Sequence, residues 1–408
     1  MKIVFLQDDF PPQSFGGAGI STFELAQGMY KAGQEVFVIT TCRKESDGKI
    51  FDHEGIRVFR IATTIPERWR SYRCLYNRQA VREVERILSE IKPDVVHVNN
   101  VHTQLSYYCL KIARRHAKAV IFTARDVMTF NFAKLTTKKY LENFDARTTW
   151  RDHIAQAGKR YNPLRNWFIK RYLRYADKIF AISKALQKAL SQNGIKNVEV
   201  IYNGIDVENW NGTRDSALKD KKVILFGGRL SEAKGGEKTV EALAQIVKGE
   251  PRAVLLVAGK IDEYAETMKK KAQSLGIADK LIFTGWIDGQ AIKNAYASAD
   301  VVLMPSICFD AFGRVNIEAM ASKKPVVGTC YGGTPEVVVD GVTGYIVNPL
   351  YPEQIAQKTL DLLKNPAKAG QFGRVGYERV KVEFNLDDKV KQYLLCYKDL
   401  LARRYNPR

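Results

Sequence analysis

The chain has 408 residues and a formal net charge of +20, with 45% hydrophobic and 26% charged residues. This length exceeds what one hydrophobic core usually supports, so two domains are expected, and the composition is that of a folded globular protein. No apolar run is long enough to cross a bilayer, and the N-terminal segment MKIVFLQDDF lacks the apolar core and cleavage site of a secretory signal. Six scattered cysteines without a CxxC pair argue against a structural zinc site or a disulfide framework, so we expect a cytoplasmic protein.

Short runs rich in Val, Ile, Leu and Phe alternate with longer amphipathic segments. Continuous apolar runs are typical of strands buried on both faces of a parallel sheet that helices cover. The strands predicted in the first half are Lys2–Leu6, Glu35–Thr40, Arg57–Ile61, Asp94–Val98, Ala119–Thr123, Lys178–Ile182 and Val198–Tyr202. Those predicted in the second half are Lys222–Phe226, Ala253–Ala258, Leu281–Gly285, Val301–Met304, Pro325–Gly328 and Gly344–Val347. Helices with 3.6-residue spacing include Val81–Ile91, Thr239–Lys248, Glu263–Leu275 and Glu353–Lys364.

Two successive sets of β–α alternation predict an α/β protein with two doubly wound domains. Turn-forming residues between positions 203 and 220 mark the boundary, which gives domains of residues 1–205 and 206–376. The tail 377–408 has a helical pattern without further strands. We expect this tail to cross back to the first domain.

Positive charge is concentrated in the first half. Residues 1–205 contain 34 Lys and Arg against 19 Asp and Glu, and residues 134–175 contain eleven basic and three acidic side chains. Six aromatic residues lie among these bases: Trp150, Tyr161, Trp167, Phe168, Tyr172 and Tyr175. An anionic membrane surface, a phosphorylated substrate or nucleic acid would complement the charge. Helix packing beneath a solvated basic surface would give the same pattern.

Glycines follow the first predicted strand, in the segment Phe15-Gly16-Gly17-Ala18-Gly19 that leads into a helix. Glycines let backbone amides approach a phosphate or sugar closely, and a helix start adds positive potential. A tight strand-to-helix turn would have the same composition. By itself the segment therefore leaves a binding role and a structural role open.

The first strand of the second domain is followed by Arg229 and Lys234, which lie beside glycines and before a helix. Two cations in this setting can neutralise a diphosphate leaving group without a metal ion. The spacing of the two residues alone is also typical of two exposed charges that bind no ligand.

The predicted strand Val301–Met304 leads into a loop with Asp310 and then into a helix that begins near Gly313 and contains Glu318. Two acidic groups can accept hydrogen bonds from vicinal hydroxyls of a sugar and a ribose. The amides near Gly313 and Arg314 can bind a phosphate at the helix start. Ligands of open parallel sheets bind outside the carboxyl ends of the strands, which is where these segments lie.

Taken together, these segments resemble glycosyltransferase family 4 in order, spacing and strand placement. The resemblance rests on GRLSEAKG, FDAFGRVNIEAMASKKPVV and GGTPE followed by DGVTGYIV, and on ADKIFAIS and IYNGID between the domains. It implies a GT-B fold, in which two Rossmann-like domains face each other and the second binds most of a nucleotide-sugar donor. It also implies retention of anomeric configuration and no metal or other cofactor, and no Asp-x-Asp metal motif occurs in the chain.

The resemblance also implies roles for individual residues. Arg229 and Lys234 would hold the diphosphate, Glu318 the donor ribose and Asp310 the transferred sugar. The remaining donor contacts would come from Gly16, Gly17, Phe312, Gly313, Arg314 and Val315. We assign Asp310, His102, Arg229 and Lys234 to catalysis.

The sequence departs from the family pattern at several positions. Glutamate usually stands where Asp310 is found, so the contact with the sugar is expected to differ. A histidine often occupies the position of Asn99. Asn99 is therefore a candidate cleft residue, and His102 is the candidate active-site histidine of the first domain. A histidine is also common where Arg125 stands, and Arg125 with Asp126 remains a candidate cleft pair. His97 lies within an apolar strand, where both a core position and a place in the cleft are open.

The resemblance implies transfer of a sugar to an acceptor, for which a growing glycan is one expectation. The basic first half suggests instead a lipid-linked or otherwise anionic acceptor, with peripheral binding to the inner face of a membrane. A nucleotide-sugar 2-epimerase shares the architecture but would need carboxylates acting as acid and base at the sugar. A basic nucleic-acid-binding protein is a second alternative, although no helix-turn-helix, zinc finger or RNA-binding signature supports it. A binding module without catalysis is the third. Nucleotide base, sugar and acceptor are not determined by these motifs.

Overall fold

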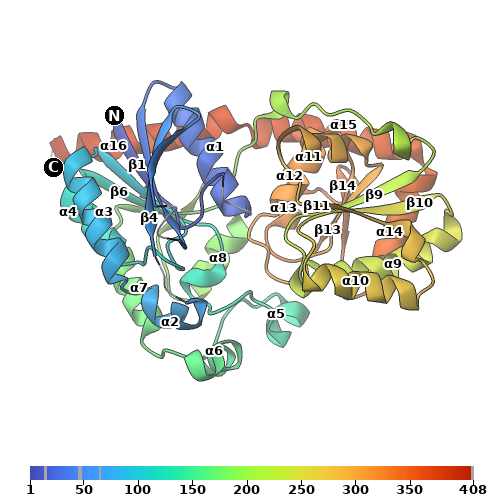
Figure 1. The fold of residues 1–408 in the computed structure, drawn as a ribbon, viewed down its shortest axis with the longest axis horizontal. Coiled ribbons are helices and arrows are strands. Elements are labelled where there is room, and N and C mark those ends of the chain that lie inside the picture. The colour runs from blue at the N-terminus through green and yellow to red at the C-terminus, as the bar shows by residue number, and fades with distance from the viewer. Residues whose placement is uncertain (13–15, 45–47, 64–65, 406–408) are drawn as a thin grey trace. The chain divides into compact units, whose positions relative to one another are not determined.

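The computed structural model describes residues 1–12, 16–44, 48–63 and 66–405, and the chain forms two compact units (Figure 1). Unit 1 consists of Met1–Tyr140, Asp145–Gly204 and Leu386–Arg408. Unit 2 consists of Leu141–Phe144 and Ile205–Asn385. Each unit contains one sheet covered by helices, which confirms the predicted α/β class with two doubly wound domains.

The sheet of unit 1 has eight strands in the order β3-β4-β2-β1-β5-β6-β7-β8. All neighbours are parallel except β3 and β4. The strands are β1 (Lys2–Leu6), β2 (Glu35–Cys42), β3 (Ile50–His53), β4 (Ile56–Ala62), β5 (Val95–Val98), β6 (Ala119–Ala124), β7 (Lys178–Ala181) and β8 (Val198–Val200). The central strands β1, β5 and β6 are buried except for Lys2, as their continuous apolar runs predict, and five of the eight residues of β2 are buried.

The edge strand β3 was not predicted from the sequence. It pairs antiparallel with β4, and its four residues alternate between exposed and half-buried. An edge strand with solvent on one side does not need the continuous apolar run that marks the buried strands. The apolar pattern therefore gave no signal for β3.

The helices of unit 1 cover the sheet on both faces and include the last helix of the chain. They are α1 (Gly17–Lys31), α2 (Arg70–Arg73), α3 (Arg78–Ile91), α4 (Cys109–His116), α6 (Trp150–Ala157), α7 (Arg165–Leu173), α8 (Lys184–Gln192) and α16 (Leu386–Tyr405), and α5 (Lys138–Asn143) begins in this unit. Figure 1 shows α16, in red, beside the blue N-terminal elements. Tyr393 and Tyr397 of α16 are buried in the same core as Phe5 and Ile121, so the C-terminal helix completes unit 1.

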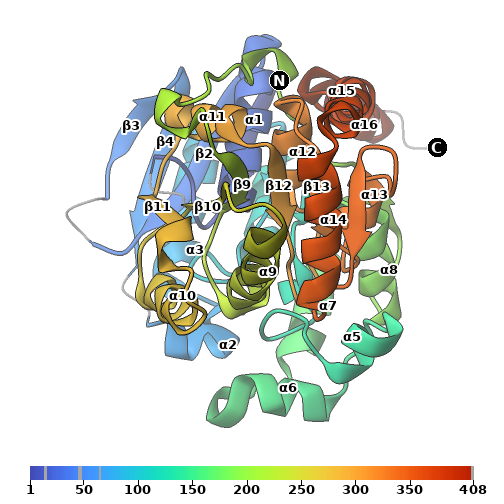
Figure 2. The ribbon, with the colours of Figure 1, turned by 90° about the vertical axis from the view of Figure 1, so that its right-hand side faces the viewer.

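The sheet of unit 2 has six parallel strands in the order β11-β10-β9-β12-β13-β14. The strands are β9 (Lys222–Gly227), β10 (Ala253–Ala258), β11 (Leu281–Gly285), β12 (Val301–Met304), β13 (Val326–Thr329) and β14 (Gly344–Val347). The helices are α9 (Gly236–Gly249), α10 (Glu263–Ser274), α11 (Gly289–Ser298), α12 (Arg314–Ala321), α13 (Thr334–Val337), α14 (Pro352–Lys364) and α15 (Pro366–Glu383). Helices α10, α9 and α14 lie side by side on the sheet (Figure 2).

Helix α15 belongs to unit 2, whereas the sequence placed the start of the returning tail near Tyr377. Phe372 of α15 is buried in the core of unit 2. A Cβ on Gly373 would lie 2.1 Å from the carbonyl oxygen of Lys323, so α15 packs directly on the backbone that follows α12. The chain enters unit 1 again at Leu386. Among the described residues, no helix is both long and apolar enough to cross a membrane.

Candidate functional site

The strand order of unit 2 reverses between β9 and β12. The chain runs outward from β9 through β10 to β11, then returns to the other side of β9 with β12 and continues to β14. In open parallel sheets, ligands bind outside the carboxyl ends of the two strands at such a reversal. The segments after β9 and β12 contain Arg229, Lys234, Asp310 and Glu318, so the topology brings the predicted donor residues of unit 2 to one edge.

Lys234 forms an ion pair with Asp310 at this edge. The ammonium contacts Oδ2 of Asp310, and the two side chains are 31% and 15% exposed. Burial has the largest single effect and lowers the pKa of Lys234, but the charge of Asp310, the charge of Cys308 and the hydrogen bond to Asp310 together outweigh it, so the pKa lies above its usual value. The charge of Arg229, which is exposed, acts on Lys234 in the opposite direction. Both predicted cations therefore lie close enough to influence each other.

The carboxylate of Asp310 is held from several directions. The backbone amide of Gly313 donates to Oδ1 at 3.0 Å, and Oγ of Ser306 lies 3.4 Å from Oδ2. The carbonyl oxygen of Asp310 accepts a hydrogen bond of 2.8 Å from the amide of Gly333. Gly332 has a φ of 65°, and a Cβ there would lie 1.9 Å from the carbonyl oxygen of Asp310, so only glycine fits. The GGTPE segment thus fixes the backbone of the Asp310 loop.

Glu318 lies one turn into α12, on the same side as Arg314. Arg314 Nε donates to Oε1 of Glu318 at 2.6 Å, and the hydroxyl of Tyr296 donates to Oε2 at 2.7 Å. Tyr296 is 1% exposed, and its burial raises the pKa of the phenol well above its usual value, with Glu318 adding to the effect. The carboxylate is therefore held in one orientation by two donors. Tyr296 was not singled out in the sequence, because it lies on α11, 22 residues before Glu318.

The remaining donor residues predicted in unit 2 surround the start of α12. Gly313 precedes the helix with a φ of 70°, and Arg314 and Val315 form its first turn. Phe312 is buried, and its ring packs edge-on against Phe384 with centroids 5.6 Å apart. Only the backbone of Phe312 is thus placed to serve as a ligand group, as the resemblance implies.

In unit 1, the strand order reverses between β1 and β5. Gly16 is the N-cap of α1 and Gly17 its first residue, and the preceding Phe15 lies outside the described residues. Asn99 follows β5, and Arg125 and Asp126 follow β6. The first-domain candidates therefore gather at the carboxyl edge of this sheet, again where ligands bind in doubly wound folds.

Asp8, two residues after β1, organises the loop that contains His102. Its carboxylate accepts hydrogen bonds of 2.7, 3.0 and 2.8 Å from the backbone amides of Thr103, Gln104 and Leu105. Burial raises the pKa of Asp8 above its usual value, although His102 and the amides act in the opposite direction. This role was not predicted from the sequence, in which the one signal for it is an acid two residues after the first buried strand.

His102 lies next to Asp126. Its Nε2 is 3.7 Å from Oδ2 of Asp126, and the two side chains are 11% and 33% exposed. The side-chain amide of Asn100 donates to the same oxygen at 3.0 Å. His102 therefore combines an acidic neighbour with partial access to solvent, the surroundings that a histidine contacting a substrate needs.

Three further candidates of unit 1, His97, Asn99 and Arg125, are buried. His97 is fully buried, with Nδ1 2.6 Å from the hydroxyl of Tyr397 and Nε2 2.7 Å from Oγ1 of Thr123. Its pKa lies well below the usual value because of burial, with a smaller contribution from the charge of Arg125. His97 is thus a core histidine, which corrects its place among the cleft candidates. Arg125 is also nearly buried, and donates at 2.8 Å from Nε to Oδ1 of the fully buried Asn99.

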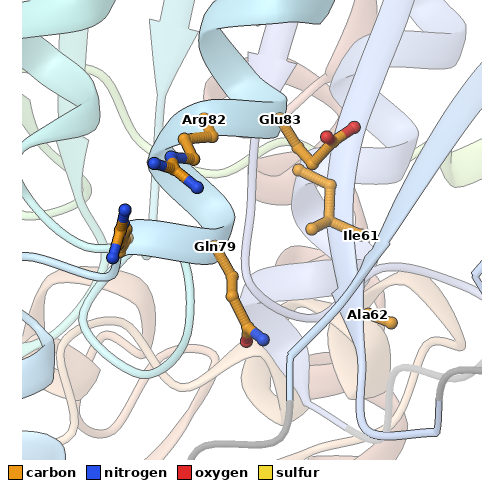
Figure 3. Close-up of a pocket in the computed structure, with 6 residues that line it drawn as sticks. Ile61, Ala62, Gln79, Arg82 and Glu83 are labelled. Carbon is orange, nitrogen blue, oxygen red and sulfur yellow. The ribbon is translucent and has the colours of Figure 1, made fainter.

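A hollow of about 500 Å³ lies elsewhere in unit 1, at the end of β4 and the start of α3 (Figure 3). It is lined by Ile61, Ala62, Arg78, Gln79, Arg82 and Glu83, none of which is a predicted site residue. Within the described ranges, no group of three or more His, Cys, Asp or Glu side chains is arranged to hold a metal ion.

Comparison with known proteins covers both units. The model described as Glycosyltransferase Family 4 matches residues 15–209, and the model of Glycosyl transferases group 1 matches residues 210–379. The chain is 27% identical to an uncharacterized glycosyltransferase of Methanocaldococcus jannaschii, over 87% of each chain. It is 24% identical to alpha-maltose-1-phosphate synthase of Mycolicibacterium smegmatis, over 98% of this chain and 100% of that protein.

Solved structures share the fold. Sucrose-phosphate synthase from Thermosynechococcus elongatus superimposes with a TM-score of 0.79 at 23% identity, over 98% of this chain and 99% of that one. Anabaena HepE in complex with UDP-glucose superimposes with a TM-score of 0.73 at 20% identity, over 98% and 100%. These similarities and the two Rossmann-like sheets confirm the GT-B fold expected from the motifs. Since the two family models together span both units, the chain belongs to glycosyltransferase family 4.

Proposed function

We propose that this glycosyltransferase moves a sugar from a nucleotide-diphosphate sugar to an acceptor, with retention of anomeric configuration and without a metal ion. The observation that carries the proposal is the pairing of Lys234 with Asp310 at the strand reversal of unit 2, beside the clamped Glu318. The similar fold of HepE, solved with UDP-glucose, supports a donor of this class.

In this proposal, Lys234 and Arg229 bind the diphosphate together with the backbone amides at the start of α12. A helix start attracts anions, because its first amides point outward and its dipole is positive there. Glu318, oriented by Tyr296 and Arg314, accepts hydrogen bonds from the ribose hydroxyls. Asp310 contacts the transferred sugar while it keeps Lys234 in place.

The reaction breaks the bond between the anomeric carbon and the diphosphate oxygen, and the electron pair stays on that oxygen. Fixed cations and amides stabilise this charge as it develops, while the sugar becomes oxocarbenium-like. The acceptor hydroxyl then forms the new bond on the same face of the sugar, and its proton passes to an oxygen of the leaving phosphate. Lys234 therefore acts on the transition state more than on the bound donor.

Unit 1 would receive the acceptor at the edge where His102, Asn100 and Asp126 lie. A sugar hydroxyl can donate to Asp126 or accept from Asn100, and His102 can do either. The excess of basic residues in this half favours an acceptor that carries phosphate or is linked to a lipid.

The experiment is a thermal-shift panel of UDP-, GDP- and ADP-sugars, followed by transfer assays with the donor that stabilises the protein. A bound donor raises the melting temperature because it binds only the folded state. We expect one nucleotide class to stabilise the protein and the product to keep the anomeric configuration in NMR spectra, with a chelator present. Stabilisation by none of the three would contradict the donor class, and an inverted product would contradict retention.

The same assays test the alternatives. Formation of an epimer from the donor without acceptor would favour a nucleotide-sugar 2-epimerase. Donor binding without transfer to any acceptor would favour a binding module in which Asp310, in place of the usual glutamate, has abolished catalysis.

A further inference from the structure

Large apolar side chains are exposed on one part of unit 1, formed by α2, α6, α7 and the segments next to them. Trp150, Leu164 and Trp167 are 58–60% exposed, and Trp69 and Ile154 are 51% and 40% exposed. Three of the five tryptophans of the chain therefore point into solvent here. We name these five residues the tryptophan face. Soluble proteins rarely expose such a cluster unless it binds a partner.

The elements that carry this face are joined to one another. The side-chain amide of Asn162 donates to the carbonyl of Ser71 at 3.1 Å, and the hydroxyl of Tyr72 donates to the carbonyl of Tyr161 at 3.2 Å. These bonds connect α2 to the segment between α6 and α7, and Figure 1 shows the three helices together at the lower end of unit 1. The exposed residues thus belong to one continuous region.

The inner side of the same helices is used for packing. Ile169 and Leu173 of α7 are buried, and Arg165 is 2% exposed and stacks 4.7 Å from the ring centroid of Phe132. His153 of α6 lies 5.1 Å from the same ring. Because α6 and α7 are already anchored by these residues, the outward tryptophans are not needed for packing of the helices.

Exposed cations lie on the same helices, α6 and α7, and on the residues next to them. They are Arg151, Lys159, Arg160, Lys170, Arg171 and Arg174. Within the part of the chain that the structure describes, none of these six forms an ion pair with a carboxylate. The single acid of α6, Asp152, is used in the capping box with Thr149. The guanidinium carbons of Arg151 and Arg171 lie 5.4 and 6.0 Å from the rings of Trp150 and Trp167.

We propose that the tryptophan face and its six cations dock unit 1 on an anionic membrane surface. Tryptophan favours the boundary between headgroups and acyl chains, and each Lys or Arg near an anionic leaflet strengthens binding to it. Ile154 and Leu164 fit acyl chains but have no counterpart on a nucleic-acid backbone, so the mixed apolar and basic chemistry selects a bilayer. Docking is separate from transfer, and it would bring the enzyme to lipid-linked acceptors.

The experiment is cosedimentation of the full chain with phosphatidylcholine vesicles, with or without phosphatidylglycerol. We expect binding only to the anionic vesicles, and a decrease as salt is raised. The double variants W150S/W167S and K170E/R171E should each lower the vesicle partition coefficient at least about tenfold. The matched controls are V382S, at a 73% exposed site of α15, and K219E/K221E, two exposed lysines of unit 2, and both should bind like the wild type.

Three outcomes would overturn the proposal: equal binding to neutral and anionic vesicles, an equal loss in K219E/K221E, or displacement of the vesicles by an oligonucleotide at comparable concentration. Thermal shifts with the donor are measured on the same variants without vesicles. An unchanged donor-induced shift shows that the site of unit 2 is intact, so failure of docking and failure of the proposed transfer are distinguished.

Discussion

Lys234 and Asp310 form an ion pair across 76 residues of sequence. The pair joins the loop after β9 to the loop after β12, the two strands at which the order of the sheet reverses. Lys234 keeps 31% of its side chain exposed, so its ammonium can bind an incoming phosphate while Asp310 holds it in position. The two residues therefore act as one unit.

Replacement of Lys234 by alanine should lower kcat by about 10²–10³-fold, the usual cost of removing one preorganised donor to a developing anion. Initial rates at saturating donor measure the effect, and circular dichroism checks the fold. Lys238→Ala is the control, because Lys238 pairs at 3.0 Å with Glu241 on α9. An unchanged kcat in Lys234→Ala would contradict a role of Lys234 in stabilising the leaving group.

The conservative change Tyr296→Phe should raise the KM for the donor about tenfold and change kcat less. A hydrogen bond to a charged group contributes about 1.5–3 kcal/mol, and its loss frees Glu318 to rotate away from the ribose. The matched control is Tyr264→Phe, which removes a hydroxyl that accepts from the amide of Glu237 at 3.2 Å. An equal effect in both variants would indicate a general loss of stability rather than positioning of Glu318.

Removal of the Asp8 carboxylate should damage both stability and activity. Asp8→Ala leaves three backbone amides of the loop 103–105 without their acceptor, at a cost of at least about 2 kcal/mol in the free energy of unfolding. Because the same loop carries His102, transfer should fall further than the population of folded protein explains. Chemical denaturation and activity assays on Asp8→Ala and on the exposed neighbour variant Asp9→Ala separate the two effects; equal behaviour of the two variants would contradict this role.

His97 should make the protein less stable in mild acid. Its folded pKa is depressed, so below pH of about 6.5 the unfolded chain takes up a proton that the folded protein does not. The free energy of unfolding should then fall by up to about 1.4 kcal/mol per pH unit from this group. NMR titration of the His97 ring provides the test: no protonation should occur while the protein stays folded, and a midpoint near 6.5 would contradict the buried geometry.

The apolar pattern predicted most of the sheets. The bounds of β1, β10 and β12 coincide with the predicted runs, because a strand covered on both faces has to be apolar throughout. The bounds of the edge strands β11 and β14 also coincide with predicted runs, although most of their residues are only partly buried. The half-exposed edge strand β3 has no such run and was missed. Helix α15 was divided by the predicted boundary near residue 377, because a helical pattern does not reveal which core the helix joins.

The donor-side candidates followed from motifs that lie within short stretches of sequence, such as GRLSEAKG and the segment around Asp310. The side chains that hold the candidate residues in position could not be predicted from these motifs. Tyr296 reaches Glu318 from a different helix, and the hydroxyl of Tyr397, 300 residues from His97, occupies one nitrogen of that ring. The sequence by itself determined the two β–α sets, the family and the edge of each sheet where ligands bind, since these depend on local periodicity and spacing. Only the tertiary structure decided that His97 is a core residue, that Asp8 holds the His102 loop and that the tryptophans of α6 and α7 point outward, because these depend on contacts between distant segments.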